Sequence, residues 1–111
     1  MSTPEKAWQI LNVVDAAQTM HVANSPECYR EVDPVTSRLV GESPSQGEVA
    51  AVMTAYALGH YYVTKWMERK AEDSDKWADA LKAWHFVGIT WKSAVIVKNH
   101  NNGIRPFGSG C

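Results

Sequence analysis

The sequence predicts an all-α fold, a three-helix bundle whose three helices are short transmembrane segments joined by a long first loop. Three windows of the 111-residue chain, residues 7–24, 49–64 and 83–97, are almost free of charge. They hold 49 residues and two charged side chains, whereas the other 62 residues hold 21. A helix at a water-exposed surface normally carries charges along one face. These windows instead carry Asn, Gln, Thr, Tyr and His, which membrane helices tolerate where such side chains meet one another.

A second interpretation is a soluble all-α interaction module that does not insert into a membrane. The mean hydropathy of the chain is low, at -0.31. No window reaches the roughly 18–20 strongly apolar residues usually required of a membrane span. In this alternative the three windows pack on one another or on a partner protein.

Size, charge and cysteine content exclude several classes of protein. A chain of this length forms one domain, residues 1–111, with a single core. A net charge of -1 without a basic cluster gives no surface for nucleic acid. Cys28 and Cys111 match no metal-ligand spacing. The N-terminal residues do not have the pattern of a secretory signal, so any insertion would use the predicted helices themselves.

The first helix is expected over residues 4–24. Thr3 is placed to cap its N-terminus, Pro4 suits the first helical position, and Glu5 complements the positive end of the helix dipole. The Ser-Pro dipeptide at 25–26 ends the helix, because a residue before proline disfavours the helical conformation.

Polar side chains of this helix form a stripe. Asn12, Asp15 and Thr19 recur at positions i, i+3 and i+7, and Gln18 lies beside them, so they share one face. Two interpretations stay open for this stripe: it faces water, or it turns into the bundle.

A long polar loop over residues 26–47 precedes the second helix, which is expected over residues 46–66. The loop contains a possible short helix at 35–40. Ser45 and Glu48 have the spacing of a capping box, which fixes the start of the second helix.

The remaining segments are a charged connector, a third helix and a tail. The connector over residues 67–82 is expected to be solvated, with helical ends. The third helix is expected over residues 76–100, with Gly103 as its C-terminal cap. Residues 104–111 are expected to form a flexible tail.

The second helix combines small and hydrogen-bonding residues. Ala55 and Gly59 belong to a repeat of small residues at every fourth position, which allows close helix packing in lipid. Tyr56, His60 and Thr64 lie on an adjacent face and are expected to hydrogen-bond to another helix. A single histidine in such a position is more often a packing residue than a metal ligand.

The third helix contains three polar residues at intervals of seven. His85, Lys92 and Asn99 have this spacing, and a seven-residue period keeps one helix face toward a partner in left-handed packing. These three side chains are therefore expected in the interior.

Lys92 and Asp15 are predicted to form a buried ion pair between the first and third helices. Each is the single charge of its window, and the two lie at similar depths if the helices run parallel. An unpaired ammonium in lipid costs several kcal/mol. The alternative is that Lys92 extends toward a headgroup while Asp15 is protonated or bonded to Gln18 and Thr19.

No enzymatic motif is present. The sequence lacks the GxSxG, HExxH, P-loop and dinucleotide-binding patterns, so no catalytic residue, metal or cofactor is expected. Asp15, His21, His60 and His85 could be combined into a metal or proton-relay site, but no two histidines have the i, i+4 spacing of a zinc motif. Ion or proton conduction along the polar stripes is a weaker possibility.

Five short motifs carry a resemblance to a known group of proteins. They are NVVDAAQT (12–19), YREVDP (29–34), GESPS (41–45), GHY (59–61) and NHNNGI (99–104). The chain resembles a group of small, uncharacterised membrane proteins of bacteria, phages and prophages with DxxQT, ExNP and NxxxGI motifs. Asp33 stands where the group has Asn. The positions that the resemblance marks are Asp15, Gln18, Thr19, Glu31, Pro34, His60, Asn99 and Gly103.

The resemblance implies an architecture and a location in the bacterial inner membrane, but no activity. The expected function is that of a non-enzymatic integral membrane protein acting through helix–helix association, in holin-like lysis or in phage entry or exclusion. Its expected partners are the lipid bilayer and either further copies of the chain or another membrane protein. The N-terminal side of the predicted topology holds six Lys and Arg residues and the other side four, which places the N-terminus in the cytoplasm. Cys28 and Cys111 then share the outer side, where they could pair.

Overall fold

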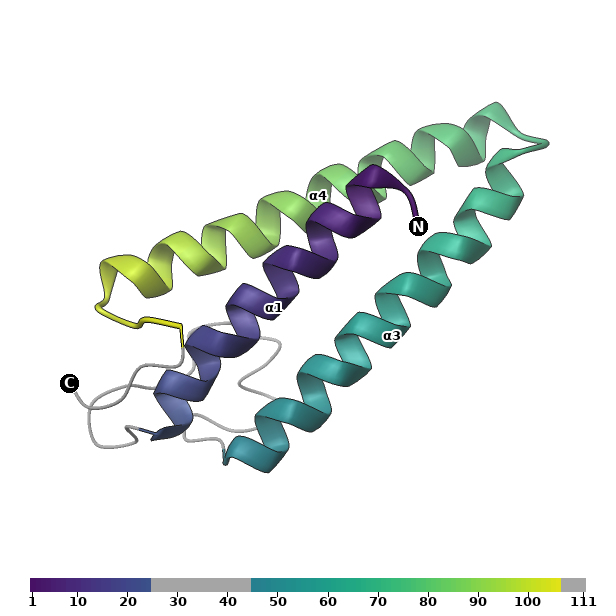
Figure 1. Cartoon of the computed structure of the whole chain (residues 1–111). Helices are drawn as coiled ribbons and strands as arrows, with labels where there is room; N and C mark the ends of the chain where they lie inside the picture. The colour runs from purple at the N-terminus through teal and green to yellow at the C-terminus, as the bar shows by residue number, and fades with distance from the viewer. Residues whose placement is uncertain (25–44, 107–111) are drawn as a thin grey trace.

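A computed structural model of the chain describes residues 1–24 and 45–106. The described residues form three helices, α1 (Thr3–Asn24), α3 (Gln46–Ala71) and α4 (Asp75–Asn101), and no strand. α3 and α4 form an antiparallel hairpin, and α1 packs along both, parallel to α4 (Figure 1). The predicted all-α three-helix bundle is confirmed. No helix in the described part of the chain combines the length and apolar character that a membrane crossing requires.

The helix starts are set by serine side chains. The Ser45 hydroxyl accepts a hydrogen bond from the Glu48 N–H at 3.2 Å, as predicted for α3. For α1 the N-cap was predicted at Thr3, one residue too late. Ser2 accepts the bond from the Glu5 N–H at 3.3 Å, because a capping hydroxyl reaches the N–H three residues ahead of it.

The connector between α3 and α4 is much shorter than predicted. α3 continues to Ala71 and α4 begins at Asp75, so most of the expected solvated segment, residues 67–82, is helical. Ser74 caps α4 by accepting from the Trp77 N–H at 3.4 Å. Most charged residues of this segment, Lys, Arg and Glu, are good helix formers. The segment can therefore be exposed to water and still be helical.

The C-terminal end of α4 is closed by a Schellman motif. Gly103 has φ 85°, and the Ile104 N–H donates to the Asn99 carbonyl at 2.9 Å. Ile104 is buried, and the Arg105 N–H donates to His21 Nδ1 at 2.8 Å. Gly103 is thus confirmed as the cap. The flexible tail was expected to begin at residue 104, but Ile104 is buried and the Arg105 N–H is bonded to His21 of α1.

Several predictions concern residues outside the described ranges. These are the possible short helix at 35–40, the loop motif with Glu31 and Pro34, the cysteines at 28 and 111, and the end of the tail over 107–111.

Along residues 7–24, 49–64 and 83–97 the bundle has a polar interior and an apolar exterior, whereas exposed charged side chains lie outside these ranges, many of them near the α3–α4 turn. Ten polar or charged side chains are buried among the described residues, against eight hydrophobic ones. Large hydrophobic side chains lie on the outside, and they include Ile10, Val13, Leu58, Tyr62, Phe86, Val87 and Val97. This distribution is the reverse of that in most proteins surrounded by water.

Gly103→Ala is predicted to lower the free energy of unfolding by about 1 kcal/mol, because an L-residue is strained at a positive φ. Gly59→Ala is the control, since a methyl group added there meets no atom within 4 Å. It is expected to raise stability by about 0.5–1 kcal/mol through helix propensity. Equal effects of the two changes in denaturant unfolding would contradict the assignment of Gly103 as the cap.

Candidate functional site

The candidate site is a polar seam along the bundle axis. We define the seam by its buried side chains: Glu5, Asn12, Asp15, Gln18, Thr19, His60, Thr64, Lys92 and Asn99. Glu5, Asn12 and Thr19 lie seven residues apart on α1, as Lys92 and Asn99 do on α4. A period of seven keeps these residues facing the neighbouring helices along the whole length of contact.

Asp15 and Lys92 form the predicted ion pair at the centre of the seam. Lys92 Nζ lies 2.6 Å from Asp15 Oδ2, and the two side chains are 4% and 1% exposed. The ammonium also lies 5.4 Å from the ring centroid of Trp8 and 5.0 Å from that of Tyr56, within the range of cation–π attraction. The alternative in which Lys92 extends outward is therefore not the arrangement observed.

Hydrogen bonds continue the seam toward the C-terminal end of α1. The Thr19 hydroxyl donates to the Asp15 carbonyl at 2.8 Å. Asn99 Nδ2 donates to Gln18 Oε1 at 3.1 Å, and Gln18 Nε2 donates to the Ile96 carbonyl at 3.2 Å. The stripe on α1 thus faces the bundle interior, where the Gln18 amide bonds to α4 and Asn12 Nδ2 donates to the Met53 carbonyl of α3 at 3.2 Å.

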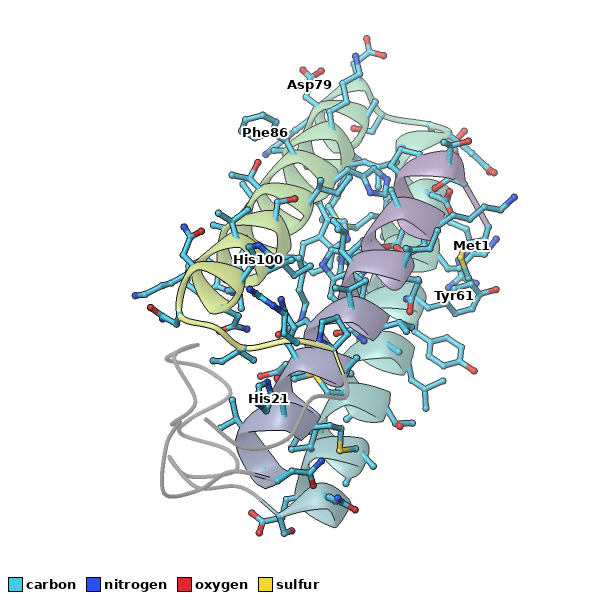
Figure 2. All side chains as sticks on the ribbon, turned by 60° about the vertical axis from the view of Figure 1, so that its left-hand side comes forward. Met1, His21, Tyr61, Asp79, Phe86 and His100 are labelled. Carbon is cyan, nitrogen blue, oxygen red and sulfur yellow. The ribbon has the colours of Figure 1, made fainter. Side chains whose placement is uncertain are left out.

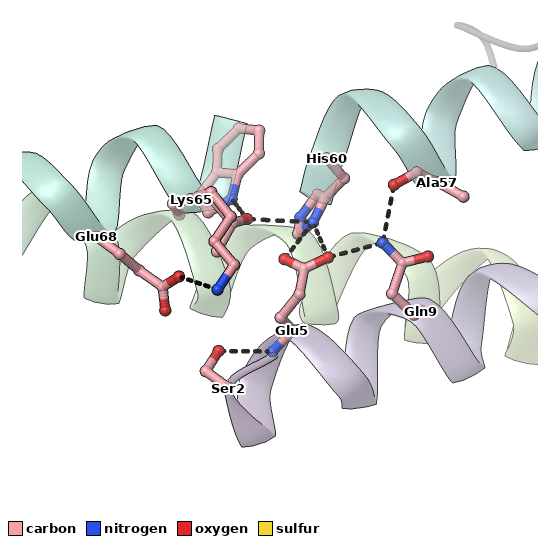
Figure 3. A network of polar contacts seen from close by, with 9 residues as sticks. Ser2, Glu5, Gln9, Ala57, His60, Lys65 and Glu68 are labelled. Carbon is pink, nitrogen blue, oxygen red and sulfur yellow. Dashed lines mark hydrogen bonds and ion pairs between the residues drawn. The ribbon is translucent and has the colours of Figure 1, made fainter. Parts of the chain in front are cut away.

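A second buried cluster joins α1 to α3 (Figure 3). His60 Nδ1 lies 2.8 and 2.9 Å from the two carboxylate oxygens of Glu5. Gln9 Nε2 donates to Glu5 Oε2 at 2.7 Å and to the Ala57 carbonyl at 2.9 Å. This cluster was not predicted from the sequence, in which Glu5 was expected only to complement the helix dipole. Glu5 lies seven residues before Asn12, and this spacing could have placed it on the same inward face of α1.

The His60 ring is enclosed by indole rings. Trp8 stacks on the His60 ring with a centroid distance of 3.7 Å and an interplanar angle of 4°. Trp84 also stacks on it, with a centroid distance of 4.8 Å and an interplanar angle of 22°. Trp84 Nε1 donates to the Thr64 hydroxyl at 2.8 Å. Gly88 makes room for this stack, since a methyl group there would lie 3.1 Å from Trp8 Cδ1. This arrangement was not predictable from the sequence, because it depends on side chains from all three helices.

Ala55 and Gly59, predicted as packing residues, are exposed. The buried face of α3 passes through Val49, Met53 and His60, and a rotation of 100° per residue puts the small residues on the far side of the helix. The small-residue face therefore does not contact α1 or α4 as its main packing surface. The small-residue pattern does not specify whether the helix that packs on this face belongs to the same chain or to another one.

The residues proposed as a possible metal or proton-relay group have separate partners. Asp15 binds Lys92, His60 binds Glu5, and His21 accepts from the Arg105 N–H. His85 is half-buried, and its Nδ1 has no hydrogen-bond partner in the described structure. Within residues 1–24 and 45–106, no group of three or more His, Cys, Asp or Glu side chains is arranged to hold a metal ion.

Neither a protein-family model nor a curated protein nor a solved structure matches the chain. The resemblance to small phage and prophage membrane proteins therefore stays a prediction.

Asp15→Asn and Lys92→Met are each predicted to cost about 3–5 kcal/mol of unfolding free energy, because each leaves one buried charge unpaired. The double variant should cost far less than the sum of the two. The matched control is Lys65→Met with Glu68→Gln, an exposed pair at 3.9 Å, for which each change should stay within about 1 kcal/mol. Additive losses at Asp15 and Lys92 would show that the pair does not contribute.

Glu5→Ala is predicted to destabilise the bundle by about 2–4 kcal/mol, because it leaves His60 and Gln9 without their buried acceptor. Glu68→Ala, on the partly exposed side of α3, should change stability by about 0.5 kcal/mol or less. Thermal unfolding of the two variants measures the difference. Similar losses would contradict a structural role for the Glu5–His60 contact.

Proposed function

We propose that the protein is a small, non-enzymatic integral membrane protein of the phage or prophage type, embedded in the bacterial inner membrane. The observation that carries this proposal is the polar seam inside an apolar exterior. A lipid bilayer gives no penalty for exposed hydrophobic side chains, and it favours burial of polar groups against one another. An all-α interaction module outside the membrane is the alternative, and it requires a partner protein to cover the same exterior.

The outer surface of α4 supports the proposal. Phe86, Val87 and Val97 are each more than half exposed, and the single charge of residues 83–97, on Lys92, is turned inward. Phe86 points away from α1 and α3 (Figure 2). An exterior of this kind is rare on a monomer in water, where large apolar patches mark interaction or membrane surfaces.

The low hydropathy of the helices has a structural source. The mean hydropathy of a helix includes the polar residues of the seam, which lower it. These residues are buried between the helices and would not contact lipid. The uncharged stretch of α3, residues 49–64, corresponds to about 24 Å of helix at ~1.5 Å per residue, somewhat less than the ~30 Å hydrocarbon core. Charged and aromatic side chains follow it directly, with Trp66 packed edge-on against Trp77 at 5.0 Å, as is common at membrane interfaces.

The exposed small-residue face supports association between copies. Ala55 and Gly59 lie on the outside of α3, and nothing lies within 4 Å of a methyl group added at Gly59. Small residues at this spacing let a second helix approach closely in lipid. Association of this kind fits a holin-like role in lysis and a role in phage entry or exclusion, the two roles expected for three short spans.

Membrane fractionation tests the proposal. The chain is expected in the membrane pellet after a carbonate wash, and recovery in the supernatant would contradict membrane insertion. Phe86→Asp should reduce the amount in the pellet, because a carboxylate that faces hydrocarbon is unfavourable, with a cost that rises toward about 2.5–3.5 kcal/mol at the centre of a span. Asp79→Asn, in the charged first part of the same helix, is the control and should leave the amount unchanged.

The N-terminus is predicted to lie in the cytoplasm, since the side that contains it and the α3–α4 turn holds six of the ten Lys and Arg residues outside the windows. Because α1 and α4 are parallel, the C-terminus should then lie on the opposite side. A reporter fused after Cys111 that is active only in the cytoplasm would overturn this orientation.

A further inference from the structure

A cleft of about 240 Å³ lies beside the polar seam. Four aromatic side chains, Trp8, Tyr56, Trp84 and Trp91, line it together with Val87 and Gly88, and His60 and Lys92 are its ionisable members. Val87, which is 62% exposed, lies at its edge on the outside of α4. The volume is about eight times the ~30 Å³ that one water molecule occupies in the liquid, enough for a molecule with a single aromatic ring.

His60 gives this cleft one specific hydrogen-bonding group. Both Glu5 carboxylate oxygens lie within 2.9 Å of His60 Nδ1, and a carboxylate can only accept, so Nδ1 carries the proton. In the neutral ring Nε2 is then an acceptor. Nε2 is buried and has no hydrogen-bond partner among the described residues, and the His60 side chain as a whole is 7% exposed.

A buried acceptor without a partner is unfavourable and is rare in folded proteins. Three features coincide here: aromatic side chains that line the cleft, a cavity of one-ring size, and, on the lining residue His60, a buried acceptor without a donor among residues 1–24 and 45–106. We propose that the cleft binds a small aromatic molecule that carries one hydroxyl, whose O–H donates to His60 Nε2 while its ring packs against Trp8 and Trp91.

Gly88 controls access to this acceptor. A methyl group at position 88 would lie 3.3 Å from His60 Nε2 and 3.1 Å from Trp8 Cδ1. It would therefore cover the nitrogen to which the ligand hydroxyl binds. Gly59 offers the matched control, because the same added methyl group there meets nothing within 4 Å.

The experiment compares two probes, para-ethylphenol and para-ethylanisole, by calorimetric titration of the full chain. The two differ in that the anisole lacks the O–H donor. Because both probes partition into detergent, all titrations use one detergent solution. The phenol is expected to bind about ten-fold more tightly than the anisole, the factor for one net hydrogen bond. In NMR spectra the indole N–H signals of Trp8, Trp84 and Trp91 should shift on binding.

Gly88→Ala should weaken phenol binding by about ten-fold and remove its preference over the anisole, whereas Gly59→Ala should bind as the unaltered chain does. Equal affinity for the two probes in the unaltered chain would overturn the proposal, as would tighter binding of the anisole. Equal phenol affinity in the two glycine variants would overturn it too. The comparison of the two probes uses the unaltered chain, so it tests the proposed hydrogen bond to His60 even if Gly88→Ala does not fold.

Discussion

The ion pair between Asp15 and Lys92 is the contact on which the register of the bundle depends. Sliding α1 by one helical turn, about 5.4 Å, would leave both charges unpaired in the interior. The same slide would separate Gln18 from Asn99, which are 3.1 Å apart. Apolar packing tolerates such shifts far better than a network of buried polar groups, in which each donor needs its own acceptor. The seam therefore selects one alignment of α1 against α4.

Glu5 and His60 fix the other helix contact of α1. Their atoms are as close as 2.8 Å, so α1 is attached to α3 by one buried charged contact and to α4 by another. These groups occupy interior space that apolar side chains fill in most bundles. Large residues such as Phe86, which is 72% exposed, are consequently on the outside. The polar seam and the apolar exterior have one cause: in each helix the polar residues lie on the face that is turned inward and the apolar residues on the face that is turned outward.

The sequence predicted those features that depend on one helix at a time. The segregation of charge located the three helices, and the similar depth of Asp15 and Lys92 in parallel helices predicted their pairing, although an outward-extended Lys92 stayed an alternative on the sequence alone. The stacking of Trp8 and Trp84 on His60 was not predictable in this way. It depends on rotamers from three helices and on the absence of a side chain at Gly88, none of which has a periodic signature.

Trp8 connects the seam with the aromatic cleft. One face of its indole stacks on His60 at 3.7 Å, and the Lys92 ammonium lies 5.4 Å from the ring centroid. The ring thus contacts the histidine of one buried pair and lies near the cation of the other. A shift of this indole would alter the stacking on His60 and the cation–π attraction at Lys92 together. Because the same ring also lines the cleft, we expect a molecule bound there to affect both contacts that hold α1 in place.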